Sequence, residues 1–201
     1  MSIRLNGSTS GYTEIDAPAV AASNTLVLPT GNGSSGQFLQ TNGSGTLSWG
    51  SQRILQVVQT VKTDYFTTSS ASFIDITGLS VAITPASSTS KVLVIAKIST
   101  ATTASVTAIT TLIRDTTAIF QGDAAGSRGR ATGNQFTGGI GHTTDSIVYL
   151  DSPATTSSTT YKIQIRANTG NTIAVNGTVA NTDTANEPRT TSSIIVMEVA
   201  A

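Results

Sequence analysis

Apolar and polar residues alternate along several stretches of this chain. In Tyr161–Ala167, apolar side chains occupy every second position, and lysine, glutamine and arginine stand between them. Leu79–Thr84 follows the same alternation, and Ile173–Val175 precedes an Asn-Gly pair that favours a tight turn. A period of two residues is typical of β-strands with one buried face and one face in water. The pattern therefore predicts β-structure in this part of the chain.

Three further stretches are apolar on both faces or nearly so. They are Ile54–Val61, Lys91–Ile98 and Ser193–Val199. A two-layer sandwich covers only one face of each of its sheets, so strands of this kind need a second cover. We expect neighbouring subunits to supply it.

The stretch Thr103–Phe120 fits two structures. Val106, Ile109 and Ile113 have the spacing of a helical face, but threonines are dense around them. Threonine is β-branched and loses side-chain freedom in a helix, which favours strands here. With eight or more short strands and no credible helix, the fold class predicted is all-β, with a jelly-roll-like β-sandwich.

The first fifty residues contain only brief apolar runs, separated by glycine, serine and asparagine. Four short strands are predicted there: Tyr12–Asp16, Asn24–Pro29, Gly36–Thr41 and Gly45–Gly50. The segment has few large apolar side chains, and their burial does not offset the entropy lost on ordering the backbone. It is therefore not expected to fold alone.

Two interpretations of this segment are open. It is either a flexible linker or a thin stem in which identical copies wrap around a shared axis. Pro18 and Pro29 stand at the ends of predicted strands, and this favours the ordered stem. We therefore predict an extended β-stem over residues 1–50 and a β-sandwich over residues 51–201.

Composition excludes several classes of function. The 201 residues include 11 Lys and Arg, 11 Asp and Glu and no cysteine. A net charge of zero gives no broad field for nucleic acid, and the absence of cysteine excludes disulfides and thiolate metal sites. The longest apolar run, Val92–Ala96, is too short for membrane insertion, and the opening residues lack a signal-peptide pattern. Synthesis in a cytoplasm is expected.

No arrangement of residues points to catalysis. His142 is the only histidine, and no G-x-S-x-G motif accompanies it. The carboxylates form no tight cluster, and Asp183–Glu187 lacks the register of a calcium-binding loop. We expect no enzyme activity, no cofactor and no metal.

The densest glycine and arginine stretch is Gly122–Arg130. Arg128 and Arg130 have the forked donors that bind anionic sugars or phosphates, and the alternative is an exposed loop or an ion pair between subunits. The candidate receptor-contact loop is Asp123–Phe136. The residues predicted to contact a receptor are Arg128, Arg130 and Phe136 in this loop and His142, with Tyr65 and Phe66 as weaker candidates.

The first fifty residues resemble a short repeat of tail-fibre-like proteins from marine and cyanobacterial phages. The likeness is carried by "APA", "NTLVLP", "GNG", "GQFLQT" and "GSGTLSW", in that order. The remainder resembles the domain that follows such repeats, through "QVVQTVKTD", "DITGLSVAITP", "SKVLVIAKIS", "YLDSPATTSSTTYKIQI" and "SSIIVMEVA". The resemblance implies a trimeric virion protein with an intertwined stem and a jelly-roll knob for adhesion.

The expected function is that of a bacteriophage virion fibre, either a tail fibre or a short fibre. Its expected partners are two further copies of the chain in a homotrimer, other virion proteins held through the stem, and a polysaccharide or protein of the host surface. The chain starts almost directly in the repeat, without a separate anchoring domain, so a capsid decoration, head fibre or tail adaptor with a purely structural role is the alternative. A polysaccharide depolymerase is the least favoured reading.

Overall fold

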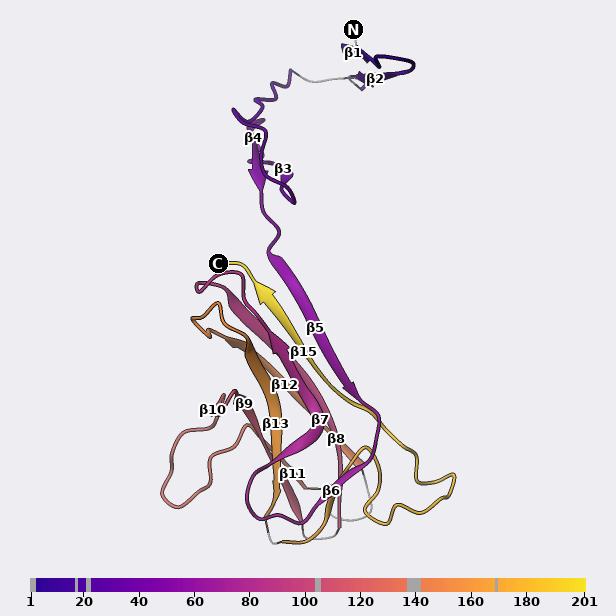
Figure 1. Cartoon of the computed structure of the whole chain (residues 1–201), viewed down its shortest axis with the longest axis vertical. Coiled ribbons are helices and arrows are strands. Elements are labelled where there is room, and N and C mark those ends of the chain that lie inside the picture. Colours follow the sequence, from indigo (N-terminus) through magenta and orange to yellow (C-terminus); the bar gives the residue numbers. More distant parts are fainter. Residues whose placement is uncertain (1–2, 17, 21–22, 104–105, 137–141, 169) are drawn as a thin grey trace. The chain divides into compact units, whose positions relative to one another are not determined.

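The computed structural model describes residues 3–16, 18–20, 23–103, 106–136, 142–168 and 170–201, drawn in Figure 1. The chain divides into two compact units, residues 1–52 and residues 53–201. Every regular element of the described residues is a β-strand, which confirms the all-β prediction. Because no helix forms there, none is available to cross a membrane.

The first unit consists of two small antiparallel hairpins. Its strands are β1 (Ile3–Asn6), β2 (Tyr12–Ile15), β3 (Phe38–Thr41) and β4 (Leu47–Gly50). The strand predicted at Asn24–Pro29 does not form, and only a single bridge links Val27 to Thr46 there. A lone bridge orders little backbone, because strand hydrogen bonds stabilise only when a ladder extends them.

Trp49 makes the main internal contact of this unit. Its indole N–H donates to the carbonyl of Gly31 at 2.7 Å, and its ring lies against Gly33. Gly33 has φ +70°, and a Cβ there would lie 2.6 Å from the ring, so glycine is required. Leu26 and Leu28 are nevertheless 67% and 69% exposed, and no apolar residue described in this unit is buried.

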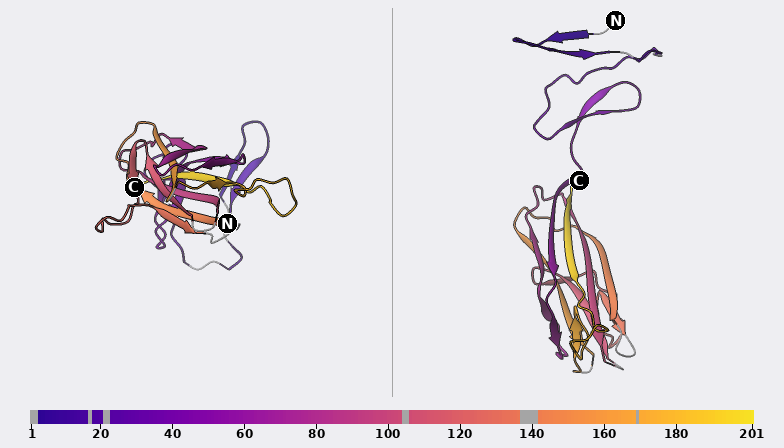
Figure 2. Two further views of the ribbon diagram at one scale, coloured as in Figure 1. Left: turned by 90° about the horizontal axis from the view of Figure 1, so that it is seen from below. Right: turned by 90° about the vertical axis from the view of Figure 1, so that its right-hand side faces the viewer.

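The second unit is a sandwich of two antiparallel sheets. The first sheet contains β5 (Ile54–Lys62), β6 (Phe66–Thr68), β8 (Lys91–Thr102), β12 (His142–Asp151), β14 (Ile173–Val175) and β15 (Ser192–Val199). The second sheet contains β7 (Ile74–Ile83), β9 (Thr107–Arg114), β10 (Thr117–Ile119), β11 (Gly133–Phe136) and β13 (Thr159–Ala167). Figure 2 shows β5 and β15 running side by side along the first sheet.

The strand order is that of a jelly roll. β5 pairs with β15, β7 with β13, β8 with β12, and β9 with both β10 and β11. Apart from the β9–β10 hairpin, each pair joins one strand from the first half of the unit to one from the second half, as in a long antiparallel ribbon that is then rolled up. The orders β5-β15-β8-β12 and β7-β13-β9-β10/β11 result, which confirms the predicted sandwich.

The core lies between the sheets, where the alternating sequence predicts it. Tyr161, Ile163 and Ile165 of β13 are fully buried, whereas Lys162 and Gln164 point outward. From the first sheet, Val92, Val94 and Ile98 of β8 and Ile194 and Val196 of β15 enter the same cluster. The region that fitted both helix and strand forms β9 and β10, as its threonine content favours.

The two outer faces of the sandwich differ in chemistry. On the second sheet, Lys162 forms an ion pair with Asp75 at 2.8 Å, and the amide of Gln164 donates to the same carboxylate. On the first sheet, the outward positions are mostly apolar. We call this surface the outer apolar face, and it consists of Leu55, Val57, Val61, Leu93, Ile95, Val148, Leu150, Ile195 and Met197.

These outward side chains line up across four strands. One row runs Leu150–Leu93–Met197–Val57, and the next begins with Val148, Ile95 and Ile195. On the two edge strands, the exposed fractions run from 40% for Leu55 to 59% for Val148. The strands that the sequence marks as apolar on both faces therefore keep one face uncovered in the single chain.

Four carboxyl groups predict how stability depends on pH. Hydrogen bonds from Lys62 to Asp64 and from Lys162 to Asp75 lower the pKa of each carboxyl. Burial raises the pKa of Glu198, but hydrogen bonds from Gln56, Ser90 and the Ala86 N–H outweigh burial and lower it. A hydrogen bond from Thr178 lowers the pKa of Glu187.

These groups should leave stability unchanged between pH 7 and pH 5 and reduce it below about pH 4. With folded pKa values below the unfolded ones, the unfolded chain takes up protons first as the pH falls, which favours unfolding. Urea midpoints at pH 7, 5 and 3 measure this. A higher midpoint at pH 3 than at pH 5 would contradict the assignment.

Candidate functional site

The sandwich has two ends that carry different features. The chain enters the sandwich at Arg53, beside the end of β15. There the N–H of Ala200 donates to the carbonyl of Arg53 at 2.8 Å. At the opposite end, β5 and β8 finish and β12 begins at His142 (Figure 1). The connection from β14 to β15, residues 176–191, also lies at this opposite end, which we call the loop end.

The base of this connection is held rigidly. Asn176 is fully buried, and its left-handed φ of 63° turns the chain out of β14. Its side-chain amide donates to the carbonyls of Lys62 at 2.9 Å and Asp64 at 3.1 Å. Its side-chain oxygen accepts from the hydroxyl of Ser192 at 2.7 Å. Fully partnered buried amides of this kind fix a loop in one arrangement.

Thr178 organises the middle of the connection. Its carbonyl accepts from the hydroxyl of Tyr65 at 2.9 Å, and its own hydroxyl accepts from the N–H of Asn181 at 3.0 Å. The same hydroxyl donates to Oε2 of Glu187, which also accepts from the N–H of Thr182 at 2.8 Å. These donors, Thr178 first, lower the pKa of Glu187, so its carboxylate is charged at neutral pH.

A cavity of about 490 Å³ opens beside this carboxylate. It lies between the end of β8, the start of β12 and the 176–191 connection. Its lining consists of Ala101, Thr102, Thr103, His142, Thr178, Val179, Ala180, Thr184, Asn186 and Glu187. A smaller hollow of about 190 Å³ shares Thr178, Thr184 and Glu187 with it and continues toward Arg189. The larger volume falls in the range of about 300–1,000 Å³ that ligand sites occupy.

The imidazole ring of His142 lines this cavity. Both ring nitrogens are buried, and neither forms a hydrogen bond with any residue that the structure describes. The residue after His142 on β12 is held in place by a side-chain hydrogen bond. The hydroxyls of Thr143 and Thr100 both donate to the side-chain oxygen of Gln135. Buried polar atoms in native proteins nearly always have a partner, so this imidazole needs an explanation.

The predicted arginines lie away from this cavity. Arg128 and Arg130 are exposed in the connection between β10 and β11. The side chain of Arg130 donates to the carbonyl of Gly122 at 2.7 Å and so closes the base of that loop. The side chain of Arg128 forms no hydrogen bond or ion pair with any described residue. Their role in receptor contact stays a prediction.

The remaining predicted residues are distributed differently. Phe136 ends β11 and is 60% exposed, so the last part of the loop expected over Asp123–Phe136 is a strand. Phe66 packs against the core, and Tyr65 supports Thr178 and lies under Arg189, whose guanidinium is 4.5 Å from its ring. Of the predicted receptor residues, His142 is the one that lines the cavity.

Sequence reasoning missed Glu187 and Thr178 as neighbours of His142. They lie at least 36 positions from it along the chain, and β14 pairing with β8 brings them to β12. The one available signal was the Asn-Gly pair at Asn176, which marks a turn but not its destination.

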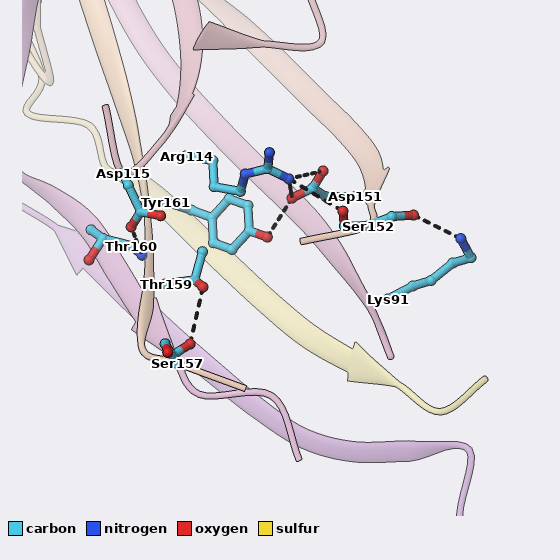
Figure 3. Close-up of polar contacts among 9 residues, drawn as sticks. All are labelled: Lys91, Arg114, Asp115, Asp151, Ser152, Ser157, Thr159, Thr160 and Tyr161. Carbon is cyan, nitrogen blue, oxygen red and sulfur yellow. Dashed lines mark hydrogen bonds and ion pairs between the residues drawn. The ribbon is translucent and has the colours of Figure 1, made fainter. Parts of the chain in front are cut away.

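A second polar cluster lies at the end where the chain enters the sandwich, and it is structural (Figure 3). The carboxylate of Asp151 is buried and accepts from Arg114 at 2.9 and 3.0 Å and from the hydroxyl of Tyr161 at 2.7 Å. Burial, together with this carboxylate, raises the pKa of Tyr161. Nearby, Lys91 donates to Ser152 at 2.8 Å. Within the described residues, no group of three metal-ligating side chains forms.

Comparison with known proteins adds little. No protein-family model matches the chain, and no curated protein matches it. The fold is similar to a chain in the structure of infectious bursal disease virus, Gx strain, with 15% identity and a TM-score of 0.37. The alignment covers 100% of this chain and 47% of the viral one, so this chain spans about half its length.

Proposed function

We propose that this protein is a bacteriophage virion fibre that assembles as a homotrimer and adheres to the host surface through its loop end. The observation that carries the proposal is the outer apolar face, which a single chain leaves in water. The largest apolar patch of a typical soluble monomer covers about 300–600 Å² and is often a site of interaction. A second copy of the chain is the occupant that size and charge favour.

Size supports this occupant. Four strands about 4.8 Å apart and a span of six residues at about 3.3 Å each give a face of roughly 300–400 Å². A specific interface buries about 800 Å² per partner, with an apolar centre and a polar rim. The outer apolar face has the dimensions of such a centre.

Charge also permits self-association. On the four strands of this face, the charged residues at outward positions are Lys91 and Lys97, near its margin, and no carboxylate occurs among them. No unpaired acid would have to be buried when copies meet. Closed rotational symmetry is the usual outcome for identical chains, and three-fold symmetry is the form that the fibre resemblance implies.

The first unit supports a fibre role. Its two hairpins bury no apolar side chain among the described residues, and residues such as Leu26 and Leu28 remain exposed. Wrapped with its sister copies, the unit would gain a shared core and partners for its strand edges. As a stem, it would attach the protein to other virion components.

Adhesion is assigned to the loop end because the chain enters the sandwich at the opposite end. Loops on a rigid sandwich are frequent binding sites, and three copies multiply weak single contacts. The proposed target is a polysaccharide or protein of the bacterial surface.

The test is competition for host cells. Full-length protein added before infection should slow phage adsorption, and antibodies against it should label fibres on intact particles. Labelling on the capsid or within the tail, with no competition, would instead support the purely structural role of a decoration, head fibre or adaptor.

A further inference from the structure

The imidazole of His142 is a buried polar group without a hydrogen-bond partner among the described residues. Its two nitrogens are buried beside a cavity of about 490 Å³, and no described residue contacts them with a hydrogen bond. One nitrogen of a neutral imidazole donates and the other accepts. A ligand that offers both a donor and an acceptor would therefore satisfy this residue.

The carboxylate of Glu187 is fixed in the same cavity. The N–H of Thr182 and the hydroxyl of Thr178 hold Oε2, and the Thr178 hydroxyl is itself positioned by the N–H of Asn181. A carboxylate held in this way loses little freedom when it accepts a hydrogen bond from a ligand. It also attracts hydroxyl donors more strongly than a neutral acceptor does.

The rest of the lining is small and mixed in polarity. Threonine hydroxyls and the amide of Asn186 provide further polar contacts, and Ala101, Val179 and Ala180 provide an apolar surface. The lining contains one carboxylate and neither lysine nor arginine among the described residues. An anionic ligand would face Glu187 without a compensating cation.

We propose that this cavity binds an uncharged pyranose unit of a surface glycan, with His142 and Glu187 as its principal polar contacts. The assignment rests on the adhesion role proposed above and names its ligand class. Neighbouring ring hydroxyls would donate to Glu187, and the imidazole of His142, whose nitrogens are buried in the unliganded chain, would turn about its Cα–Cβ bond to exchange a hydrogen bond with the sugar. The C–H face of the sugar ring would lie against Val179 and Ala180.

The test uses His142 as its own reporter, because it is the only histidine in the chain. The full-length protein is titrated with methyl α-mannoside, methyl α-glucoside, methyl β-galactoside and N-acetylglucosamine, and with glucuronate as the anionic comparison. We expect at least one neutral sugar to shift the ¹H–¹⁵N NMR resonances of the His142 imidazole. The shift should saturate at millimolar sugar concentrations.

Two variants locate the binding. Glu187→Gln should raise the dissociation constant at least about tenfold, because a charge-assisted hydrogen bond becomes a neutral one. Ala180→Phe leaves the hydrogen bonds of Glu187 in place and narrows the cavity, and should abolish the shift. The matched control is Asp75→Asn, which removes a carboxylate from the outer face of the second sheet, away from the cavity, and should leave binding unchanged. Backbone amide spectra confirm that each variant is folded.

Each outcome decides the matter. If no neutral sugar gives a saturable shift, if glucuronate binds more tightly, or if Ala180→Phe binds like the unaltered chain, the ligand assignment is overturned. Competition for adsorption to host cells tests the fibre proposal separately from the sugar-binding assignment. Protein that competes for cells but ignores the sugars keeps its adhesion role and loses this site, whereas sugar binding without competition leaves the site and removes the adhesion role.

Discussion

Exchanging Ile195 for glutamate should convert the assembled protein into single chains. Ile195 lies on β15, an inner strand of the first sheet, between Ile95 on β8 and Gln59 on β5. Its side chain points outward into the outer apolar face, opposite the buried Ile194 and Val196. In a single chain, glutamate at this partly exposed position would still reach water.

In an assembly, the same carboxylate would be buried against apolar side chains with no cation opposite it. Burying an unpaired charge costs several kcal/mol even after local relaxation, and each 1.4 kcal/mol changes a dissociation constant about tenfold. The constant for assembly should therefore rise by more than about 100-fold. Native mass spectrometry and sedimentation velocity at micromolar concentration measure the change.

Ser80→Glu is the matched control. Ser80 points outward from β7 on the polar face of the second sheet, next to Lys162 on β13. A glutamate there adds the same charge and should leave the assembly intact. If the unaltered protein is already a single chain, or if both variants assemble normally, the outer apolar face is not the contact between copies.

Replacing Asp151 by alanine should destabilise the sandwich by about 3 kcal/mol. The substitution leaves Arg114 without its carboxylate and the fully buried hydroxyl of Tyr161 without its acceptor. Removing one member of a buried ion pair typically costs about 3–5 kcal/mol, and the partial exposure of Arg114 places this site at the lower end. Urea unfolding followed by fluorescence and circular dichroism gives the free energy of unfolding.

Tyr161→Phe provides the comparison for this prediction. It removes the same hydroxyl hydrogen bond but keeps the ion pair between Arg114 and Asp151, and should cost about 1 kcal/mol. Equal losses in the two variants would mean that the ion pair contributes nothing measurable. In that case the cluster would act only through the tyrosine.

Strand positions in the sandwich could be predicted because burial there follows the alternation of residues. Tyr161–Ala167 alternates in sequence and in exposure, and the three stretches apolar on both faces became β5, β8 and β15. In each of these strands, alternate side chains face the core and the others face outward. The two-residue period of the sequence therefore indicates which side chains are buried.

Other features could not be predicted because they depend on partners distant in sequence. The run Asn24–Pro29 has the composition of a strand, yet in one chain only Val27 finds a bridge. Glu187 is one of several scattered carboxylates until β14 pairs with β8 and brings its connection to His142. Long-range pairing of this kind leaves no mark in local residue patterns.

The hydrogen bonds that hold the base of the 176–191 connection have an evolutionary consequence. Asn176 and Ser192 are joined through their side chains, and the N–H of Thr190 also donates to the carbonyl of Asn176. The segment between these anchors can change in length and composition without disturbing the register of β14 or β15, because longer loops add little closure entropy. A lineage could thus change its recognition surface by replacing the connection between β14 and β15, while the sandwich itself stays the same.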